Sequence, residues 1–215
     1  MTARHAPPTT TTRTRVLVKH PDPLLRVGIA AALSAHGGIE VFQDDLDERL
    51  QSPPIDVVIS DYADALRLAA PGQRALQRLD GVRIVALTTQ GREADIRGAI
   101  EAGVHGYLLL GGPLTELVEA VTAAARGQRY LGLAVAQRMA DSLTRTALTS
   151  RETEVLALVV AGESNKTIAR RLDIELGTVK SHMGAIMGKL GATSRTHAAA
   201  IALARGLVGA SATIA

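Results

Sequence analysis

The sequence of 215 residues contains no cysteine and no tryptophan, and its aromatic residues are one phenylalanine and three tyrosines. Without cysteine, disulfides, thiol catalysis and cysteine-ligated zinc are all excluded. The six histidines form no H-x-x-H or H-E-x-x-H pair, so nothing in the sequence indicates a metal site or a cofactor. The scarcity of aromatics also argues against a protein that stacks single-stranded bases.

Long apolar runs are also missing. No run approaches the roughly 18 residues that a membrane span needs, and the first residues do not form a signal peptide. The apolar content of 47% nevertheless supports a substantial core, and the length suits two small domains. We therefore expect a cytoplasmic protein with no membrane partner.

Positive charge is concentrated in the C-terminal part of the chain. From Leu148 onward eight Lys and Arg residues oppose five acidic residues, an excess of 8 − 5 = +3, which equals the net charge of the whole chain. The rest of the chain is therefore neutral on balance. Because few aromatics accompany this charge, duplex DNA is a better candidate partner than a single strand.

Residues 14–126 alternate short apolar runs with segments of helical spacing, after a polar leader (1–13) that we expect to be disordered. The expected strands are 15–20, 39–42, 56–60, 83–87 and 104–110, and the expected helices are 24–36, 44–51, 64–79, 93–102 and 114–125. This alternation predicts an α/β, doubly wound, five-stranded parallel sheet. Asp61 and Thr88 follow strands, at the edge where such sheets hold their sites.

The remainder predicts a linker with one short helix (127–146) and then an all-α four-helix domain (147–211). Thr149 and Glu152 form a capping box at the start of its first helix. Ser164 is placed to cap a second helix, 165–172, and a turn leads to a third, 178–190. This organisation is typical of a helix-turn-helix, whose later helix reads the major groove.

The third helix of this domain has two unlike sides. Val179, Met183, Ile186 and Leu190 share one side at helical spacing, which predicts that this side faces a core. The opposite side is small and polar, with Ser181, Gly184, Ala185 and Gly188. Taken alone, the helix is equally an ordinary amphipathic surface helix.

The wider pattern resembles the LuxR/FixJ-type helix-turn-helix: Thr149-x-x-Glu152, Ala161-Gly162-x-Ser164-Asn165-Lys166, Gly177-Thr178-Val179-Lys180-x-His182 and Lys189-Leu190-Gly191. The resemblance implies a third helix in the major groove and a fourth that often pairs two protomers. Base-facing positions would be Lys180, Ser181 and Gly184. Candidates for phosphate contact or support would be Asn165, Lys166, Thr178, His182 and Lys189.

Residues 14–126 resemble the receiver domain of NarL/FixJ response regulators, with Asp61 as the phosphoacceptor-like residue, Thr88 as the switch hydroxyl and Tyr107 as the switch aromatic. His20-Pro21 replace the acidic pair that would hold Mg²⁺, and Leu110 replaces the lysine. We therefore expect no phosphorylation by the usual Mg²⁺-dependent route, since Mg²⁺ needs carboxylates. Three controls stay open: a fixed state in which His20 or Lys19 pairs with Asp61, a decayed site kept for dimerisation, or a small ligand.

The sequence thus predicts a DNA-binding transcriptional regulator that is not an enzyme and has no catalytic residues or cofactors. The expected partners are double-stranded promoter DNA and a second copy of the chain, with a partner protein or small-molecule ligand at the receiver. Two alternatives remain. One is a conventional phosphorylation-dependent two-component response regulator, and the other is a protein–protein interaction module that has lost DNA binding.

Overall fold

The computed structural model describes residues 13–43, 54–72 and 81–208. The chain divides into two compact units, one built around a sheet and one around the C-terminal helices. Three sequence predictions lie outside the described residues: the polar leader except for Arg13, the helix 44–51, and the later part of the helix 64–79.

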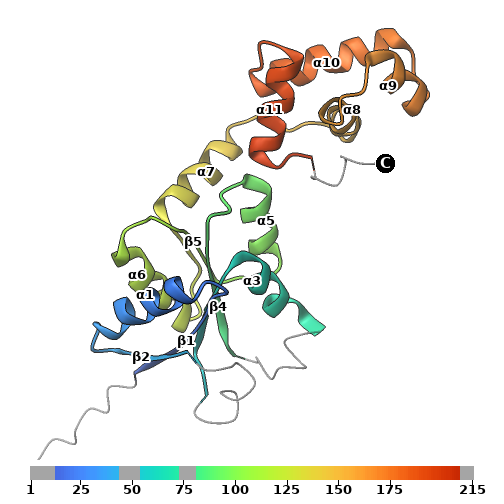
Figure 1. The fold of residues 1–215 in the computed structure, drawn as a ribbon. Helices are drawn as coiled ribbons and strands as arrows, with labels where there is room; N and C mark the ends of the chain where they lie inside the picture. The colour runs from blue at the N-terminus through green and yellow to red at the C-terminus, as the bar shows by residue number, and fades with distance from the viewer. Residues whose placement is uncertain (1–12, 44–53, 73–80, 209–215) are drawn as a thin grey trace, which may run out of the picture. The chain divides into compact units, whose positions relative to one another are not determined.

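The sheet contains six parallel strands in the order β2-β1-β3-β4-β5-β6 (Figure 1). The strands are β1 (Thr14–Lys19), β2 (Ile39–Phe42), β3 (Val57–Ser60), β4 (Arg83–Thr88), β5 (Gly106–Leu109) and β6 (Tyr130–Leu131). The chain runs outward from β1 to β2 and then returns to β3 on the other side of β1. The strand order therefore switches between β1 and β3, and a site is expected beyond their carboxyl ends.

The sixth strand corrects the predicted five-stranded sheet. β6 pairs with β5 through Gly106↔Tyr130 and Tyr107↔Leu131, although these residues fall in the segment predicted to be a linker, 127–146. A strand of two residues is too short to show an alternating pattern, so it could not be predicted from periodicity.

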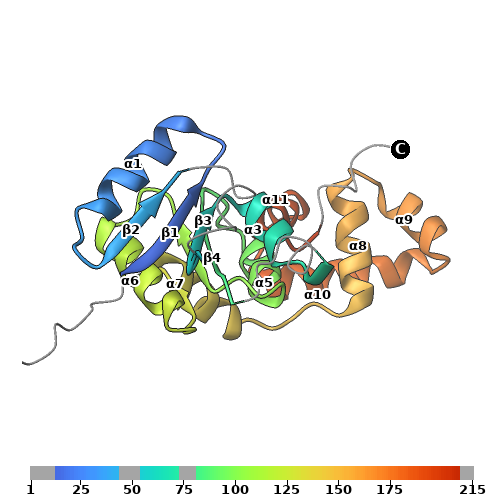
Figure 2. The ribbon, with the colours of Figure 1, turned by 90° about the horizontal axis from the view of Figure 1, so that it is seen from below.

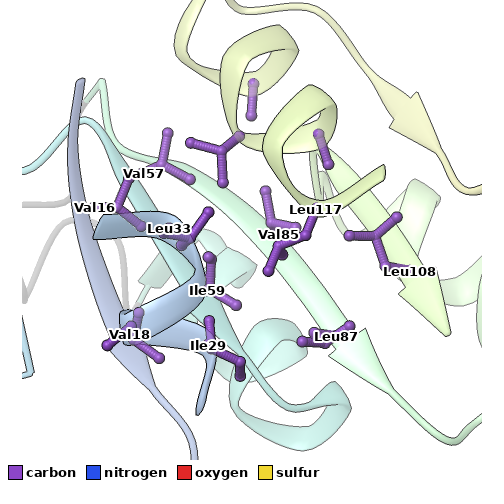
Figure 3. Close-up of a cluster of buried hydrophobic side chains, with 14 residues drawn as sticks. Val16, Val18, Ile29, Leu33, Val57, Ile59, Val85, Leu87, Leu108 and Leu117 are labelled. Carbon is purple, nitrogen blue, oxygen red and sulfur yellow. The ribbon is translucent and has the colours of Figure 1, made fainter. Parts of the chain in front are cut away.

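Helices cover both faces of the sheet. α1 (Pro23–Ser34) and α6 (Leu114–Ala125) lie on one face, and α3 (Tyr62–Ala69) packs on β3 and β4 from the other (Figures 1 and 2). The aliphatic core between the strands and the α1–α6 layer is shown in Figure 3 and includes Val16, Val18, Ile29, Leu33, Val57, Ile59, Val85, Leu87, Leu108 and Leu117. Because both faces are covered, the central strands are apolar throughout.

Local capping explains where α1 begins. The side chain of Asp22 accepts hydrogen bonds from the amides of Leu24 and Leu25, at 2.8 and 3.2 Å, and Pro23 occupies the first helical position. Asp at the N-cap followed by Pro is a favoured helix start, since Pro lacks the amide that would otherwise need a partner. The carboxylate of Asp22 is thereby used for structure.

The remaining helices are α5 (Glu93–Glu101), α7 (Leu133–Leu143), α8 (Ser150–Val160), α9 (Asn165–Leu172), α10 (Leu176–Leu190) and α11 (Arg195–Arg205). α9 has the predicted bounds, α7 starts one residue before its predicted position, and α10 starts two residues earlier than predicted. Over the residues that the structure describes, no helix is both long and apolar enough to cross a membrane.

Candidate nucleic-acid interface and receiver site

The core of the C-terminal unit fixes which side of α10 faces outward. The four apolar residues predicted to share a side, Val179, Met183, Ile186 and Leu190, are all buried. They pack in one cluster with α8, α9 and α11, which contribute Val155, Leu156, Val159, Ile168, Ala198 and Ala202. With its apolar side anchored in this cluster, α10 presents its other side to solvent.

We define the outer face of α10 as six exposed residues after its first two positions: Thr178, Lys180, Ser181, Gly184, Ala185 and Gly188. A Cβ atom added to Gly184 or Gly188 would meet nothing within 4 Å, so the packing of this domain does not require glycine at either position. Each glycine costs helix stability, roughly 1 kcal/mol relative to alanine. The outer face is therefore unusually flat, which allows close approach of another surface.

Basic side chains without partners lie on α9 and α10. In the described part of the chain, Lys166, Arg170 and Lys180 are exposed and form no ion pair. Lys166 and Arg170 are four residues apart and therefore share one face of α9. The sequence analysis did not single out Arg170, because sequence alone could not show that its neighbour Arg171 pairs with Glu163 at 2.8 Å while Arg170 stays unpaired.

Asn165, one of the candidates for phosphate contact or support, is partly engaged within the domain. The side-chain oxygen of half-buried Asn165 accepts a hydrogen bond from Arg195 at 2.7 Å, and Arg195 also donates to the carbonyl of Glu163. Asn165 therefore connects the start of α9 to the start of α11 and has only its amide NH₂ left to donate. His182 is half-buried, whereas Thr178 is exposed.

Lys189, a predicted candidate for phosphate contact or support, lies outside the outer face of α10. Its ammonium donates to Glu152 at 2.7 Å, and the Glu152 side chain is only 6% exposed. Glu152 also completes the capping box with Thr149 at the start of α8. The hydrogen bond from Lys189, followed by that from the Thr149 amide, lowers the pKa of Glu152. We therefore assign Lys189 a structural role.

The start of α10 has an acidic residue at its N-cap. Glu175 is exposed and its side chain makes no capping hydrogen bond, as expected since Glu is a poor cap. The preceding helix α9 ends at Asp173, which has a left-handed backbone with φ of 51°. The two helices are thus joined by a tight turn, as a helix-turn-helix requires.

In the sheet unit, Asp61 stands at the carboxyl end of β3, where the sequence placed it. Its Oδ1 accepts a hydrogen bond from the Asp64 amide at 2.8 Å, so it is the N-cap of α3. α3 starts immediately after Asp61, and no loop separates the strand from the helix. The carboxylate of Asp61 is therefore partly used to start a helix.

Lys19 neutralises Asp64, and the predicted pairing of Lys19 or His20 with Asp61 is not found among the described residues. The Lys19 ammonium lies 3.1 Å from Asp64, which also binds Arg67 at 2.9 Å. Burial alone would raise the pKa of Asp64, but the hydrogen bonds and charges of Lys19 and Arg67 lower it below its usual value. The sequence could not show which of the two carboxylates, Asp61 or Asp64, pairs with Lys19, because they are only three residues apart.

These residues do not fit a Mg²⁺ site. Mg²⁺ prefers carboxylate oxygens and water, but β1 is followed by His20, which is 8% exposed and whose Nδ1 accepts from the Asp22 amide at 3.1 Å. Asp22 caps α1 and Asp64 pairs with Lys19. Over the described residues, no group of three or more metal-ligating side chains is present.

The switch-like residues of the receiver are held by local bonds. Thr88 is buried, and its hydroxyl accepts from the Gln90 amide at 3.1 Å. Tyr107 is 1% exposed, and its hydroxyl donates to the Gln90 carbonyl at 2.8 Å. Its ring also contacts Tyr62 edge-on. Leu110 packs against the aliphatic core beside α1 and α6, so no ammonium lies at that position.

Known proteins resemble this chain in both sequence and structure. Residues 146–202 match the family described as bacterial regulatory proteins, luxR family. The transcriptional regulatory protein LiaR of Bacillus subtilis is 31% identical over 203 residues, which cover 87% of this chain and 96% of LiaR. The nitrate/nitrite response regulator protein NarL of Escherichia coli is 31% identical over 205 residues, which cover 86% of this chain and 92% of NarL.

Solved structures of the response regulator RcsB share the fold. RcsB of Salmonella typhimurium has a TM-score of 0.69 at 20% identity, covering 87% of this chain and 98% of its own. A structure described as two RcsB dimers bound to two parallel DNAs has a TM-score of 0.63 at 22% identity, covering 89% and 98%. Together with the identity to LiaR and NarL over most of both chains, these likenesses lead to one conclusion. The chain belongs to the response-regulator transcription factors of the NarL and LiaR type, with a luxR-family DNA-binding domain.

Proposed function

We propose that this regulator binds promoter DNA as a homodimer through the outer face of α10, and that its receiver works without Mg²⁺-dependent phosphorylation. In this proposal it acts in the cytoplasm and is controlled by dimerisation, a partner protein or a small ligand. The observation that carries the Mg²⁺-independent part of the proposal is that three acidic side chains that follow β1 and β3, Asp22, Asp61 and Asp64, already have structural partners.

The geometry of α10 suits a major groove. The helix has 15 residues and is therefore about 22 Å long, and the groove is roughly 12 Å wide. The flat outer face would admit the helix deeply, with Lys180 and Ser181 at the base edges. The exposed charges of Lys166 and Arg170 would bind phosphates, as backbone contacts generally position such domains. RcsB, which shares the fold, has been solved as dimers on DNA.

A salt titration distinguishes phosphate contacts from structural lysines. We expect Lys166→Met and Lys180→Ala each to flatten the slope of log affinity against log salt by about 0.9, because each removes one neutralised phosphate. Lys189→Met should leave the slope unchanged, since its ammonium is bound to Glu152. Fluorescence anisotropy with a labelled promoter duplex, selected from random sequence by the purified protein, measures all three slopes.

The alternative module, one that has lost DNA binding, gives a different result in the same titration. A protein without a DNA-binding face would select no duplex from the random pool. Its residual binding to an arbitrary duplex would be weak, and the slope of log affinity against log salt would be the same in all three variants. Three residues favour this alternative: Gly184 and Gly188, which offer no side chain to a base, and Glu175, whose exposed carboxylate at the start of α10 would repel phosphate. The unpaired cations on α9 and α10 outweigh them.

Phosphorylation independence is tested by mass. After incubation with acetyl phosphate and Mg²⁺, we expect the intact protein to gain no stoichiometric phosphate. The reason is that the dianionic phosphate on Asp61 would have neither a carboxylate-bound Mg²⁺ nor a lysine at position 110 to neutralise it. Mass spectrometry of the intact chain at short times after mixing reads this directly.

The control for this experiment is Asp61→Asn, treated in the same way. An adduct in the wild type that is absent from Asp61→Asn would refute the proposal and would establish the conventional phosphorylation-dependent alternative. The double variant His20→Asp with Pro21→Asp supplies the missing acidic pair. A gain of phosphate in that variant alone would show that these two positions are the cause.

A further inference from the structure

A cavity opens between α1 and the loop that joins β5 to α6, on the face of the sheet opposite α3. Its volume is about 230 Å³, and its walls include Leu25, Gly28 and Ala32 of α1 together with Leu110, Leu114 and Leu117. An engineered cavity of about 150 Å³ binds benzene, and on that scale this one accepts about nine or ten non-hydrogen atoms. The cavity thus has the size of a small ligand site.

Missing side chains create this space. Gly28 faces the cavity from the middle of α1, and a Cβ atom there would meet nothing within 4 Å. Gly111 and Gly112 form the opposite rim. Leu110, which stands where the receiver lysine would be, turns to the aliphatic core and lines the same cavity. The replacement of that lysine therefore gives the cavity an apolar wall.

A single acidic group determines which ligand fits. Among the described residues that line the cavity, Glu116 is the one charged side chain. It is half-buried, and its Oε1 accepts a hydrogen bond from the Leu133 amide at 3.2 Å, which holds the carboxylate in place. With no basic side chain in the wall, a carboxylate or phosphate would be repelled. A cationic head group would instead be paired and hydrogen-bonded.

We infer that this cavity binds a small apolar amine, whose hydrocarbon part fills the leucine-lined space and whose ammonium donates to Glu116. The inference deepens the proposed function and rests on it in one respect, since it names a ligand class for a receiver that is not phosphorylated. Such a ligand would contact α1 and α6 at once, and its stabilisation of the receiver would grow with the logarithm of its concentration once that concentration exceeds the Kd.

The test uses the full-length chain and three probes of equal chain length: octylammonium, 1-octanol and octanoate. Methyl NMR of leucine-labelled protein follows their binding, because leucines line the cavity. We expect octylammonium to bind at least tenfold more tightly than octanoate, with 1-octanol between them. Glu116→Gln should remove the preference for octylammonium over 1-octanol but retain the binding of 1-octanol.

Gly28→Leu locates the site. Leucine is a better helix former than glycine, so the variant should fold, and its side chain should fill the cavity and abolish binding of all three probes. The matched control is Val27→Leu, which adds a methylene group on the same helix at a residue that is 56% exposed and does not line the cavity. We expect this control to bind octylammonium as the wild type does.

Three results would overturn the inference. Octanoate binding as tightly as octylammonium would exclude the role of Glu116, and binding that persists in Gly28→Leu would place the ligand elsewhere. The third is that no probe binds at millimolar concentration while sedimentation shows a dimer that Gly28→Leu dissociates, because a second copy would then cover the cavity. A phosphate adduct on Asp61 would refute the proposed function instead, and would leave the probe binding unchanged.

Discussion

Changing Lys180 and Ser181 together to glutamate should lower the affinity for promoter duplex at least about 100-fold, roughly 3 kcal/mol. Both side chains are exposed on the outer face of α10, and Lys180 has no ion-pair partner among the described residues. The double change replaces one positive charge with two negative ones at the surface that we place against the groove. Loss of phosphate neutralisation and repulsion by the backbone act in the same direction.

The control for the double variant has the same change in net charge on the other unit. Arg129→Glu with Thr115→Glu also shifts the charge by −3 and alters two exposed residues of the receiver. Anisotropy titrations at one salt concentration should give this control nearly wild-type affinity. If the folded double variant Lys180→Glu with Ser181→Glu retained full affinity, the proposal that α10 enters the major groove would be wrong.

The local features of the C-terminal unit could be predicted from sequence because their signals are short-range. The capping box of Thr149 and Glu152 is present as predicted, and Ser164 caps α9 through the Thr167 amide. The apolar side of α10 was read from a spacing of three and four residues, and all four of its members are buried. Caps and periodicity depend on neighbours within about one helical turn.

Contacts between distant residues could not be predicted in the same way. The family resemblance makes Lys189 and Asn165 candidates for phosphate contact or support, but it does not identify their partners. Lys189 pairs with Glu152, 37 residues earlier, and Asn165 accepts from Arg195, 30 residues later. Each pairing depends on how α8 to α11 pack together, which composition and spacing do not specify. In the proposed function we therefore favour the exposed cations Lys166, Arg170 and Lys180 for contact with DNA.

The receiver shows the same division between local and long-range information. The sequence predicts Asp61 and Thr88 at the carboxyl edge of the sheet, because the strands before them are recognisable as apolar runs. It did not show that Asp61 caps α3 or that Lys19 binds Asp64. These bonds support the proposal of a receiver that works without Mg²⁺, since they give Asp61 and Asp64 partners within the protein. The missing acidic pair is thus accompanied by compensating contacts.

Replacing Lys189 with methionine should destabilise the C-terminal unit by about 2 kcal/mol. Removing one partner of a fully buried ion pair costs roughly 3–5 kcal/mol. The expected loss is smaller here because Lys189 is 23% exposed and Glu152 keeps its hydrogen bond from the Thr149 amide. Hydrogen exchange of α8 and α10 amides in the full-length protein measures the change. Lys166→Met, at an exposed lysine without an ion pair, should alter it by under about 0.5 kcal/mol.

The pH dependence of this loss separates the charge of Lys189 from its packing. The Lys189 hydrogen bond is the largest cause of the lowered pKa of Glu152. A carboxyl with a lowered pKa contributes its full stability above its unfolded pKa, about 4.3. That contribution is lost as the pH falls through the folded pKa, because both states then carry the proton. The difference between wild type and Lys189→Met should therefore be constant from pH 6 to 8 and shrink below about pH 4. A difference that stayed the same at low pH would mean that the lysine stem acts by packing alone, and Glu152 would then serve only as the cap of α8.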